Sequence, residues 1–487
     1  MAAPAEAAAT PEAAVDALSA RYDAAVAALR GALERYAETG KPPDPKARAD
    51  GLFCYPELRV IYQPDGPAPL ISRAFGKFAQ PGVYAASITR PEFFRAYLLE
   101  QLHLLDEIYD VDFEVGTSSD EIPFPYVLES AGKETLGALS DPTALARHFP
   151  STELTDIGDE LADGLWAQGP DAPLPLALFD APRADYSLQR LQHYTGTEVA
   201  DFQQYILFTN YHRYVDAFIA WGLGQLGEGE YDGFVAPGVS VETNEKDAGA
   251  RIDAGPWRRS QMPAYHLKAP GRRGITLVNI GVGPSNAKTI TDHLAVLRPQ
   301  CWMMIGHCGG LRHSQRLGDY VLAHAYLRCD NVLDDVIPIE VPVPAIAEIQ
   351  VALQDAAAEV TGQSGETLKT RLRTGTVVTN ADRNWELRAS TEARRFNQSR
   401  AIAIDMESAT IATNGFRFRV PYGALLCVSD KPLHGELKLP GPAGRFYEEA
   451  VSQHLQIGIA ALERLKRDGD AALHSRKLRA FDEPPFR

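Results

Sequence analysis

Seven residues in the second half of the chain, Gly274-Ile-Thr-Leu-Val-Asn-Ile280, form an almost continuously apolar run that glycines follow. A strand buried on both faces of a parallel sheet has this character, because neither of its faces meets water. Similar runs recur to the end of the chain, with helical periodicity between several of them. This alternation predicts an α/β fold with a mainly parallel central sheet, over about 240 residues.

The other elements of this half follow from the same criteria. Further strands are expected at 234–241, 301–305, 320–325, 374–379, 401–404 and 423–429. Helices are expected at 285–297, 346–360, 407–414 and 445–467. The polar segment 242–255 is expected to be a loop.

The first half lacks regular alternation. About ten Ala/Pro-rich residues form a leader that we expect to be frayed. Apolar residues then recur at spacings of three and four over 15–36, which predicts an amphipathic helix that ends at Gly40. Strand-like runs at 58–62 and 110–115 and a helical pattern at 91–105 follow. This mixture predicts a smaller α+β domain over residues 1–185.

Residues 186–226 are expected to be a helical linker, counted with a second domain at 186–487. Aromatic residues recur along this linker at helical spacing, and we expect them to fill a core. They are Phe202, Tyr205, Phe208, Tyr211 and Tyr214.

Charge and composition exclude several classes of function. Lys and Arg number 48 against 64 Asp and Glu, which gives a net charge of −16, so neither nucleic acid nor anionic lipid is an expected partner. No run of 18 apolar residues and no secretory signal occurs. The five cysteines are scattered without a CxxC pair, which indicates reduced thiols, no zinc site and a cytoplasmic protein.

Glycines and polar residues follow the expected strands. In an open α/β sheet, ligands bind beyond the carboxyl ends of the strands, so these segments predict one pocket at one edge. The segments are 281–285 (GVGPS), 306–310 (GHCGG), 379–382 (TNAD), 405–407 (DME) and 429–430 (SD).

The first of these segments places Gly283 and Ser285 before a helix. Bare amides at a helix amino terminus favour an anion or a sugar hydroxyl, although a tight structural turn explains the glycines equally well. The segment is not a dinucleotide fingerprint, because Asn286 replaces the third glycine, and it lacks the ending of a Walker A loop.

Three titratable residues are candidates for chemistry. Asp430 follows the apolar run 424–428, where partial desolvation would raise its pKa and suit a general acid. Glu407 could accept hydrogen bonds from two vicinal ribose hydroxyls. For both carboxyl groups, capping of a following helix is the structural alternative. His307 is either a ligand-binding residue or a loop histidine with ordinary hydrogen bonds.

The order GVGPS, IGHCGG, DMESAT and VSD resembles the nucleoside phosphorylase/nucleosidase superfamily. The resemblance implies that Met406 and Glu407 hold the ribose and that Asp430 protonates the purine at N7. Longer segments look like the AMP nucleosidase family, densely from about Gln261 onward and more thinly before. They are NIGVGPSNAKTITDHLAVLRP, MIGHCGGLRHSQ, RTGTVVTNADRNWELR, DMESATIA, LLCVSDKPLHGELKLPG, EIPFPYVLE and NYHRYVDAF.

This resemblance implies hydrolysis of AMP to adenine and ribose 5-phosphate, in purine salvage or control of the AMP level, without a cofactor for the chemistry. It also implies a homohexamer whose amino-terminal domain is regulatory, with MgATP as activator and phosphate as inhibitor. A purine nucleoside phosphorylase and a module that senses AMP or ATP without turnover are the alternatives. Glu407 and Asp430 argue against the sensor, which needs no acid at N7.

One departure from the wider superfamily concerns the nucleophile. Hexameric phosphorylases carry an Arg and a Ser that bind phosphate where this chain has Met304-Ile-Gly-His307. Loss of the charge-assisted bond from Arg costs about 1.5–3 kcal/mol, so water is the expected nucleophile. Glu242 is a candidate for activating it by position alone.

The remaining substrate contacts are assigned by resemblance and by proximity in sequence. Trp385 or its neighbour Asn384 is placed where the family stacks the base, with core packing as the alternative for Trp385. The expected substrate-binding residues are Met406, Gly283, Ser285, His307, Gly309, Trp385, Arg312 and Ser429, and no metal ligand is expected. The cations considered for the 5′-phosphate are Arg312, Lys288, Arg383 and Lys431.

Overall fold

The computed structural model describes residues 5–71, 73–128, 145–170, 172–227, 229–243, 245–437, 443–475 and 478–487. Parts of three sequence features lie outside these ranges: residues 1–4 of the leader, Glu129 of EIPFPYVLE and residues 438–441 of LLCVSDKPLHGELKLPG. The chain forms two compact units, Met1–Gln189 with Arg479–Arg487, and Arg190–Leu478. The boundary between them falls within helix α7 (Ala181–Thr195).

The first unit is built on a five-stranded sheet in the order β1-β4-β2-β3-β5. Its strands are β1 (Glu6–Ala8), β2 (Cys54–Tyr62), β3 (Gly82–Ser87), β4 (Val111–Glu121) and β5 (Leu174–Pro175). The expectation of a frayed leader is wrong for Glu6–Ala8, because these residues pair antiparallel with Phe113–Val115 of β4. Backbone pairing orders this segment despite its small side chains.

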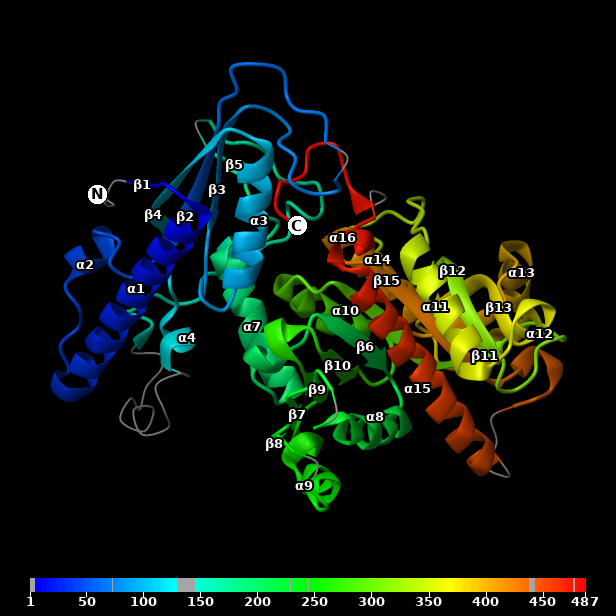
Figure 1. Cartoon of the computed structure of the whole chain (residues 1–487). Helices are drawn as coiled ribbons and strands as arrows, with labels where there is room; N and C mark the ends of the chain where they lie inside the picture. Colours follow the sequence, from blue (N-terminus) through cyan, green and yellow to red (C-terminus); the bar gives the residue numbers. More distant parts are fainter. Residues whose placement is uncertain are drawn as a thin grey trace. The chain divides into compact units, whose positions relative to one another are not determined.

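Helix α1 (Pro11–Thr39) confirms the amphipathic helix that the periodicity predicts. Thr10 accepts a hydrogen bond from the Ala13 N–H at its start, and Gly40 ends it in the left-handed conformation with φ 67°. Its buried face, which includes Leu29 and Leu33, packs against β2 and β4 (Figure 1). The other α-helices in the described part of this unit are α2 (Pro45–Ala49), α3 (Arg95–Ile108), α4 (Phe124–Leu128) and the first part of α7.

The second unit contains a ten-stranded sheet in the order β14-β13-β12-β15-β11-β6-β10-β9-β7-β8. Its strands are β6 (Tyr205–Thr209), β7 (Gly233–Ala236), β8 (Val239–Val241), β9 (Ala264–Lys268), β10 (Ile275–Asn279), β11 (Cys301–Gly310), β12 (Tyr320–Cys329), β13 (Leu372–Asn380), β14 (Ala403–Asp405) and β15 (Tyr422–Asp430). The predicted α/β class is confirmed, and every strand predicted between 274 and 429 is present.

Strand direction changes within this sheet. Strands β10, β11 and β15 are parallel, as predicted, and so is β6, which lies between β10 and β11. Strand β12 runs antiparallel to β15, and β13 is parallel to β12. Strands β13 and β14 therefore run opposite to the central strands, a reversal that the predicted parallel arrangement did not include. Because β14 also pairs with β11, strands β11, β15, β12, β13 and β14 close into a ring. This closure returns the segment after β14 to the centre of the unit.

The predicted helical linker is wrong in its middle. Tyr205–Thr209 forms strand β6 between β10 and β11. The α-helices α7 and α8 (His212–Gln225) lie on either side of it, with a short 3₁₀ helix at Val199–Asp201. Phe202, Tyr205 and Phe208 are fully buried, which confirms their place in a core. The helical spacing of the aromatic residues misled the prediction, because periodicity cannot distinguish a buried strand from a buried helix in a short apolar run.

Two further segments differ from the prediction. The strand expected at 234–241 is a hairpin of β7 and β8 that turns at Pro237-Gly238, where Gly238 has φ 72°. The expected loop at 242–255 contains helix α9 (Ala248–Ala254). Strand β9, which joins this hairpin to β10, was not predicted.

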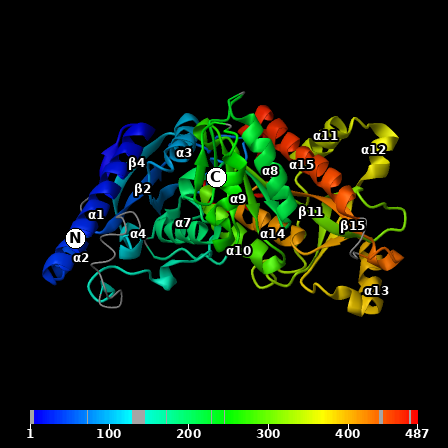
Figure 2. The ribbon, with the colours of Figure 1, turned by 90° about the horizontal axis from the view of Figure 1, so that it is seen from below.

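Helices cover both faces of the central strands. Helices α8, α11 (Ala347–Thr361) and α15 (Ala443–Asp468) lie together on one side, and α10 (Pro284–Leu294) packs against α14 (Ser408–Phe418) on the other (Figure 2). The remaining helices are α12 (Gly365–Arg371), α13 (Ala389–Ser399) and α16 (Asp470–Leu473). The central strands are thus buried on both faces, as their composition requires.

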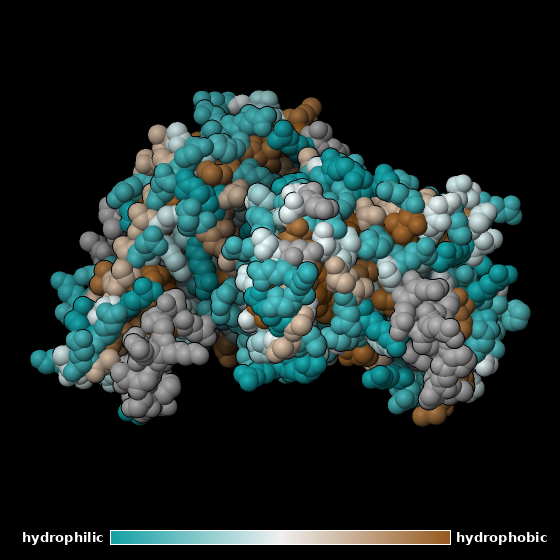
Figure 3. Space-filling model, turned by 60° about the horizontal axis from the view of Figure 1, so that its bottom comes forward, coloured by the Kyte–Doolittle hydropathy of each residue, from teal (hydrophilic) through white to brown (hydrophobic). Residues whose placement is uncertain are grey.

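The face drawn in Figure 3 is mostly hydrophilic, with hydrophobic residues in small separate groups. None of the described helices has the length and apolar character that a bilayer crossing needs.

Candidate active site

The carboxyl group of Glu407 lies where three strand ends meet. Its Oε1 accepts a 2.7 Å hydrogen bond from the Gly283 N–H, after β10, and its Oε2 accepts a 2.9 Å bond from Asn210 Nδ2, after β6. Glu407 itself follows β14 and is fully buried. The structure thus brings together the segments after β10 and β14 that the sequence placed in one pocket.

Asp405 caps helix α14 in place of Glu407. Its Oδ2 accepts a 2.8 Å bond from the Ser408 N–H, and its Oδ1 accepts one of 2.6 Å from Thr379 at the end of β13. Glu407 occupies the N-cap position but makes no side-chain cap bond. The capping alternative for Glu407 is therefore wrong, and its carboxyl group faces the ends of β6 and β10.

Asp405 and Glu407 are both buried, and the charge of Asp405 affects the pKa of Glu407. Burial, with the nearby charge of Asp405, raises the pKa of Glu407 to about 8, against the opposing effect of the hydrogen bonds from Gly283 and Asn210. Burial likewise raises the pKa of Asp405. A carboxyl group that changes charge near neutral pH in a buried position is a frequent property of functional sites.

Gly283 begins helix α10 with φ 113°, a conformation that residues other than glycine rarely adopt. This conformation aims its N–H at Glu407. Ser285 lies one residue inside the helix and is exposed, and its carbonyl accepts a bond from Thr289 Oγ1. The glycines therefore build a specific contact to a carboxyl group, beyond a tight turn.

His307 lies on β11 rather than in a loop. Its ring contacts the edge of Tyr211, with ring centroids 5.1 Å apart, and packs against Tyr214 on α8 at 5.5 Å. It is half-buried, as is Gly309 two residues further along the strand. His307 and Gly309 thus lie on β11, the strand that pairs with both β14, which precedes Glu407, and β15, which ends at Asp430.

Asp430 ends β15 opposite Gly309, and its Oδ1 accepts a 2.6 Å bond from Ser429 Oγ. Ser429 also approaches the Cys308 carbonyl at 3.3 Å. Asp430 is half-buried, and Lys431, not Asp430, occupies the N-cap position of the 3₁₀ helix Pro432–His434.

Glu407 and Asp430 lie at two levels along β11. Asn210, the partner of Glu407, lies against Gly306, since a Cβ added to Gly306 would be 3.2 Å from Asn210 Oδ1. Asp430 lies opposite Gly309. Three residues separate these levels, or roughly 10 Å of strand. The burial of Cys308 between them, with Asp405 and Asp430 both nearby, raises the pKa of its thiol.

Trp385 lies in a hydrophobic cluster, with 6% of its surface exposed and its ring edge-on to Phe396 at 5.3 Å. Core packing, the structural alternative, is what this arrangement shows, and base stacking by Trp385 stays a prediction. Its neighbour Asn384 is exposed.

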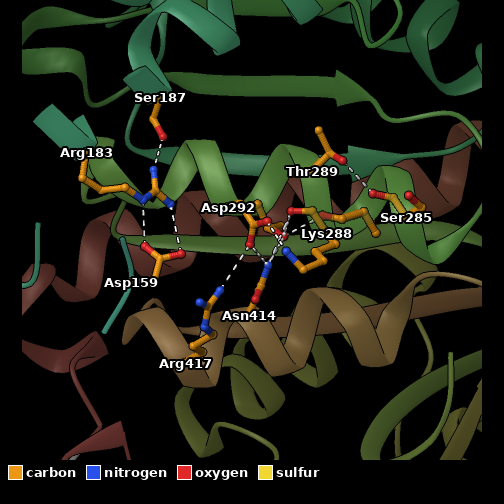
Figure 4. Close-up of polar contacts among 11 residues, drawn as sticks. Asp159, Arg183, Ser187, Ser285, Lys288, Thr289, Asp292, Asn414 and Arg417 are labelled. Carbon is orange, nitrogen blue, oxygen red and sulfur yellow. Dashed lines mark hydrogen bonds and ion pairs between the residues drawn. The ribbon is translucent and has the colours of Figure 1, made fainter. Parts of the chain in front are cut away.

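The cations considered for the 5′-phosphate fall into two groups. Lys288 Nζ lies 2.5 Å from Asp292, toward which Asn414 and Arg417 of α14 also point (Figure 4). Lys431 is paired at 2.5 Å with Glu436. Arg312 and Arg383 have no carboxylate partner in the described part of the chain, and Arg312 is the half-buried one.

Met406, Glu242 and Asn210 differ in their position relative to Glu407. Met406 is half-buried beside Glu407. Glu242 is exposed after the edge strand β8, and β10, β9 and β7 lie between that strand and β6, so the structure does not bring it to Glu407. Sequence reasoning missed Asn210, although it directly follows the apolar run Tyr205–Thr209, as a strand-end residue should.

The chain is similar to known proteins over nearly its whole length. Residues 13–173 match the family described as bacterial AMP nucleoside phosphorylase N-terminus, and residues 241–463 match the phosphorylase superfamily. The AMP nucleosidases of Escherichia coli K12 and O157:H7 are each 57% identical over 481 residues, which cover 98% of both chains. A crystal structure of AMP nucleosidase from Bacteroides thetaiotaomicron covers 58% of this chain and 98% of its own, with 29% identity and a TM-score of 0.44. Because the curated relatives match nearly end to end at this identity, the chain belongs to the AMP nucleosidase family.

Proposed function

We propose that this chain hydrolyses the N-glycosidic bond of AMP and releases adenine and D-ribose 5-phosphate. The observation that carries the proposal is the buried Glu407 carboxyl group at the meeting point of β6, β10 and β14, in a chain of this family. Cleavage of this bond makes the ribose cationic, and a fixed carboxylate stabilises that charge in a site with little water.

Asp430 is proposed as the general acid. Adenine leaves more readily when N7 takes up a proton, and Asp430 lies at the end of a buried strand where a base can reach it. The hydroxyl of Ser429 donates to Oδ1 and so helps to hold the Asp430 carboxyl group in place at the end of β15. Water then adds to C1 of the ribose, and the proton that it releases replaces the one that Asp430 gave to the base, so the acid is restored and the reaction balances.

Water is preferred to phosphate as the nucleophile because of the residues on β11. Met304 is fully buried, and none of the residues at 304–307 is an arginine that could bind phosphate. For the 5′-phosphate, Arg312 is the better candidate among the four cations, since Lys288 and Lys431 are already held by carboxylates. Replacing Arg312 with Ala should raise the KM for AMP more than it lowers kcat.

The test is incubation of the pure protein with AMP in phosphate-free buffer. The proposal expects free adenine and ribose 5-phosphate in equal amounts, and unchanged products when phosphate is added. Phosphate-dependent release of adenine, with a sugar phosphorylated at C1, would instead establish a phosphorylase. AMP binding without release of adenine would establish a sensor.

We further propose a cytoplasmic homohexamer for purine salvage or control of the AMP level, activated by MgATP and inhibited by phosphate, with the first unit as the regulatory part. These properties rest on the family resemblance. The first unit has a cavity of about 400 Å³ whose described lining includes Glu57, Asp120, Asp156, Glu160 and Asp180 but no Lys, Arg or His. A bare phosphate would be repelled there, so we place the phosphate effector elsewhere.

Rates with and without MgATP and phosphate, together with the mass in solution, test this second proposal. A mass of about six times 53.2 kDa and opposite responses to the two effectors are expected. A monomer with no response to either would refute it.

A further inference from the structure

Asn210 was not among the residues that the sequence indicated, yet it holds one of the two oxygens of Glu407. Its Nδ2 donates to Oε2 at 2.9 Å, while the Gly283 N–H holds Oε1 at 2.7 Å. An ionised carboxylate only accepts hydrogen bonds, so the amide must present its NH₂ group to Oε2. Two donors from two different strand ends fix the plane of the carboxyl group.

The space around Asn210 is also specific. A Cβ on Gly306 of β11 would lie 3.2 Å from Asn210 Oδ1 and 2.7 Å from Met304 Cε. The methionine end is flexible, but the amide is held by Glu407 and could not retreat without breaking that bond. The absence of a side chain at Gly306 therefore leaves room for Asn210 in the orientation that the hydrogen bond needs.

We propose that Asn210 is a positioning residue for the proposed hydrolysis: it orients the Glu407 carboxylate so that the remaining acceptor directions of this group face the ribose hydroxyls. The inference rests on the proposed function for its catalytic consequence. Asn210 need not touch the substrate, because its effect passes through Glu407. Truncation of Asn210 should thus change what Glu407 does, rather than remove a contact to AMP.

The pKa of Glu407 distinguishes a positioning role of Asn210 from a purely structural one, because a residue that only stabilises the fold would not change that pKa. The hydrogen bond from Asn210 lowers the pKa of Glu407, against burial and the charge of Asp405, which raise it. Titratable side chains on the adjoining strands include His307 and Cys308 on β11, and Cys427 and Asp430 on β15. Removal of the Asn210 donor should move the pKa of Glu407 further upward.

The experiment uses the full chain with Asn210→Leu, which keeps the branching at Cγ, excludes water and removes the donor. We expect kcat at pH 7 to fall roughly 10- to 100-fold with KM within a few-fold, since bonds to charged groups are the strong ones. The ascending limb of the pH profile of kcat/KM should move to higher pH. In a Glu407→Gln background the same substitution should have little further effect on kcat.

Gln203→Leu is the matched control. Gln203 lies just before β6, while Asn210 lies just after it, and its buried amide oxygen accepts bonds from the Ala269 and Gly274 N–H groups. This control should lower Tm equally at pH 6 and pH 9 without moving the pH profile. For Asn210→Leu, the loss of Tm should be larger at pH 9, where Glu407 is ionised. The melting experiment needs no substrate.

Gly306→Ala is a second variant that keeps Asn210 but displaces its amide, and it should produce a smaller shift of the pH profile in the same direction. The proposal is overturned if Asn210→Leu leaves the pH profile in place, or if its effects and those of Glu407→Gln are additive. If the wild-type protein releases no adenine from AMP, the proposed function fails. The pH-dependent Tm then still decides whether Asn210 acts through Glu407.

Discussion

The Gly283 N–H donates a 2.7 Å hydrogen bond to Oε1 of Glu407, across 124 residues of sequence. This bond joins the start of α10 to the segment between β14 and α14, two helices that also pack against each other. The helix start, which an anionic ligand could have occupied, is thus turned toward a carboxylate of the protein itself. The geometry makes Gly283 part of the support of Glu407, the residue proposed to hold the ribose.

Replacing Gly283 with Ala should damage both stability and catalysis. A Cβ meets no atom within 4 Å there, but φ of 113° is strained for alanine, at a cost of about 1–3 kcal/mol. Relief of the strain rotates the N–H away from Glu407, so kcat should fall about tenfold or more. Gly362→Ala is the control, with φ 65° in open space at the end of α11. It should lower Tm and leave kcat unchanged, and equal effects on kcat would refute the assignment.

Glu407→Gln should lower kcat more than it weakens the binding of AMP. The amide retains an oxygen for the Gly283 N–H, and Asn210 can turn its own oxygen toward the new NH₂ group, so the fold is kept. The negative charge matters most when the ribose becomes cationic, and a loss on the order of 100-fold in kcat is expected. Measured kcat, and the Kd from equilibrium binding, separate the two effects. A raised Kd with an unchanged kcat would show that Glu407 only holds the substrate.

The sequence was sufficient to find both candidate carboxyl groups, because each follows a buried strand that its apolar run identifies without further information. Glu407 comes after Ala403–Asp405 and Asp430 comes after residues 424–428. A strand end is a local property, and so is a glycine that must adopt a positive φ, such as Gly283. These parts of the site could therefore be predicted without knowledge of the pairing of strands.

The partners of these residues depend on pairing and could not be predicted. Asn210 follows β6, a strand of five residues among aromatic residues at helical spacing. A run this short shows neither the helical nor the strand periodicity clearly, so the strand could not be recognised. The reversal at β12 and the closure of β14 onto β11 result from contacts between strands that are far apart in sequence. Burial of Trp385 against Phe396 likewise reflects tertiary packing. The sequence therefore did not show which of the polar residues at the strand ends are hydrogen-bonded to one another.

The activity should depend on pH through Glu407. Its pKa is raised to about 8 by burial and the charge of Asp405. In the proposed reaction, the ionised form of Glu407 stabilises the ribose cation. For the free enzyme, kcat/KM should therefore rise with pH up to about 8. Because the folded pKa exceeds the ordinary value, the stability linked to this group is present at low pH and is lost as the pH rises through about 8. Tm measured against pH checks that sign.

Asp405→Asn provides the test of this pH dependence. The amide removes the neighbouring negative charge, so the pKa of Glu407 should fall and the ascending limb of kcat/KM should move to lower pH. One amide oxygen remains to accept from Ser408 or Thr379, so a stability loss of about 1 kcal/mol is expected. An unmoved limb would mean that a different group controls it.

Asp430→Asn should nearly abolish hydrolysis while AMP binds within a few-fold of the wild-type affinity. The side chain is half-buried at the end of β15, opposite Gly309, and Ser429 already donates to one of its oxygens. An amide has the same shape and still accepts from Ser429, but it has no proton to give to N7 of the base. General acid catalysis typically contributes about 10²–10⁴-fold, and the loss of kcat should fall in that range. Ser429→Ala is the matched variant, because it removes the neighbouring hydroxyl and keeps the acid, so its loss should be far smaller. A substrate whose base leaves without protonation should be cleaved by Asp430→Asn at close to the wild-type rate, which separates a missing proton from a damaged site. If Asp430→Asn keeps more than half of the wild-type rate with AMP, another group protonates the base and Asp430 has a structural role.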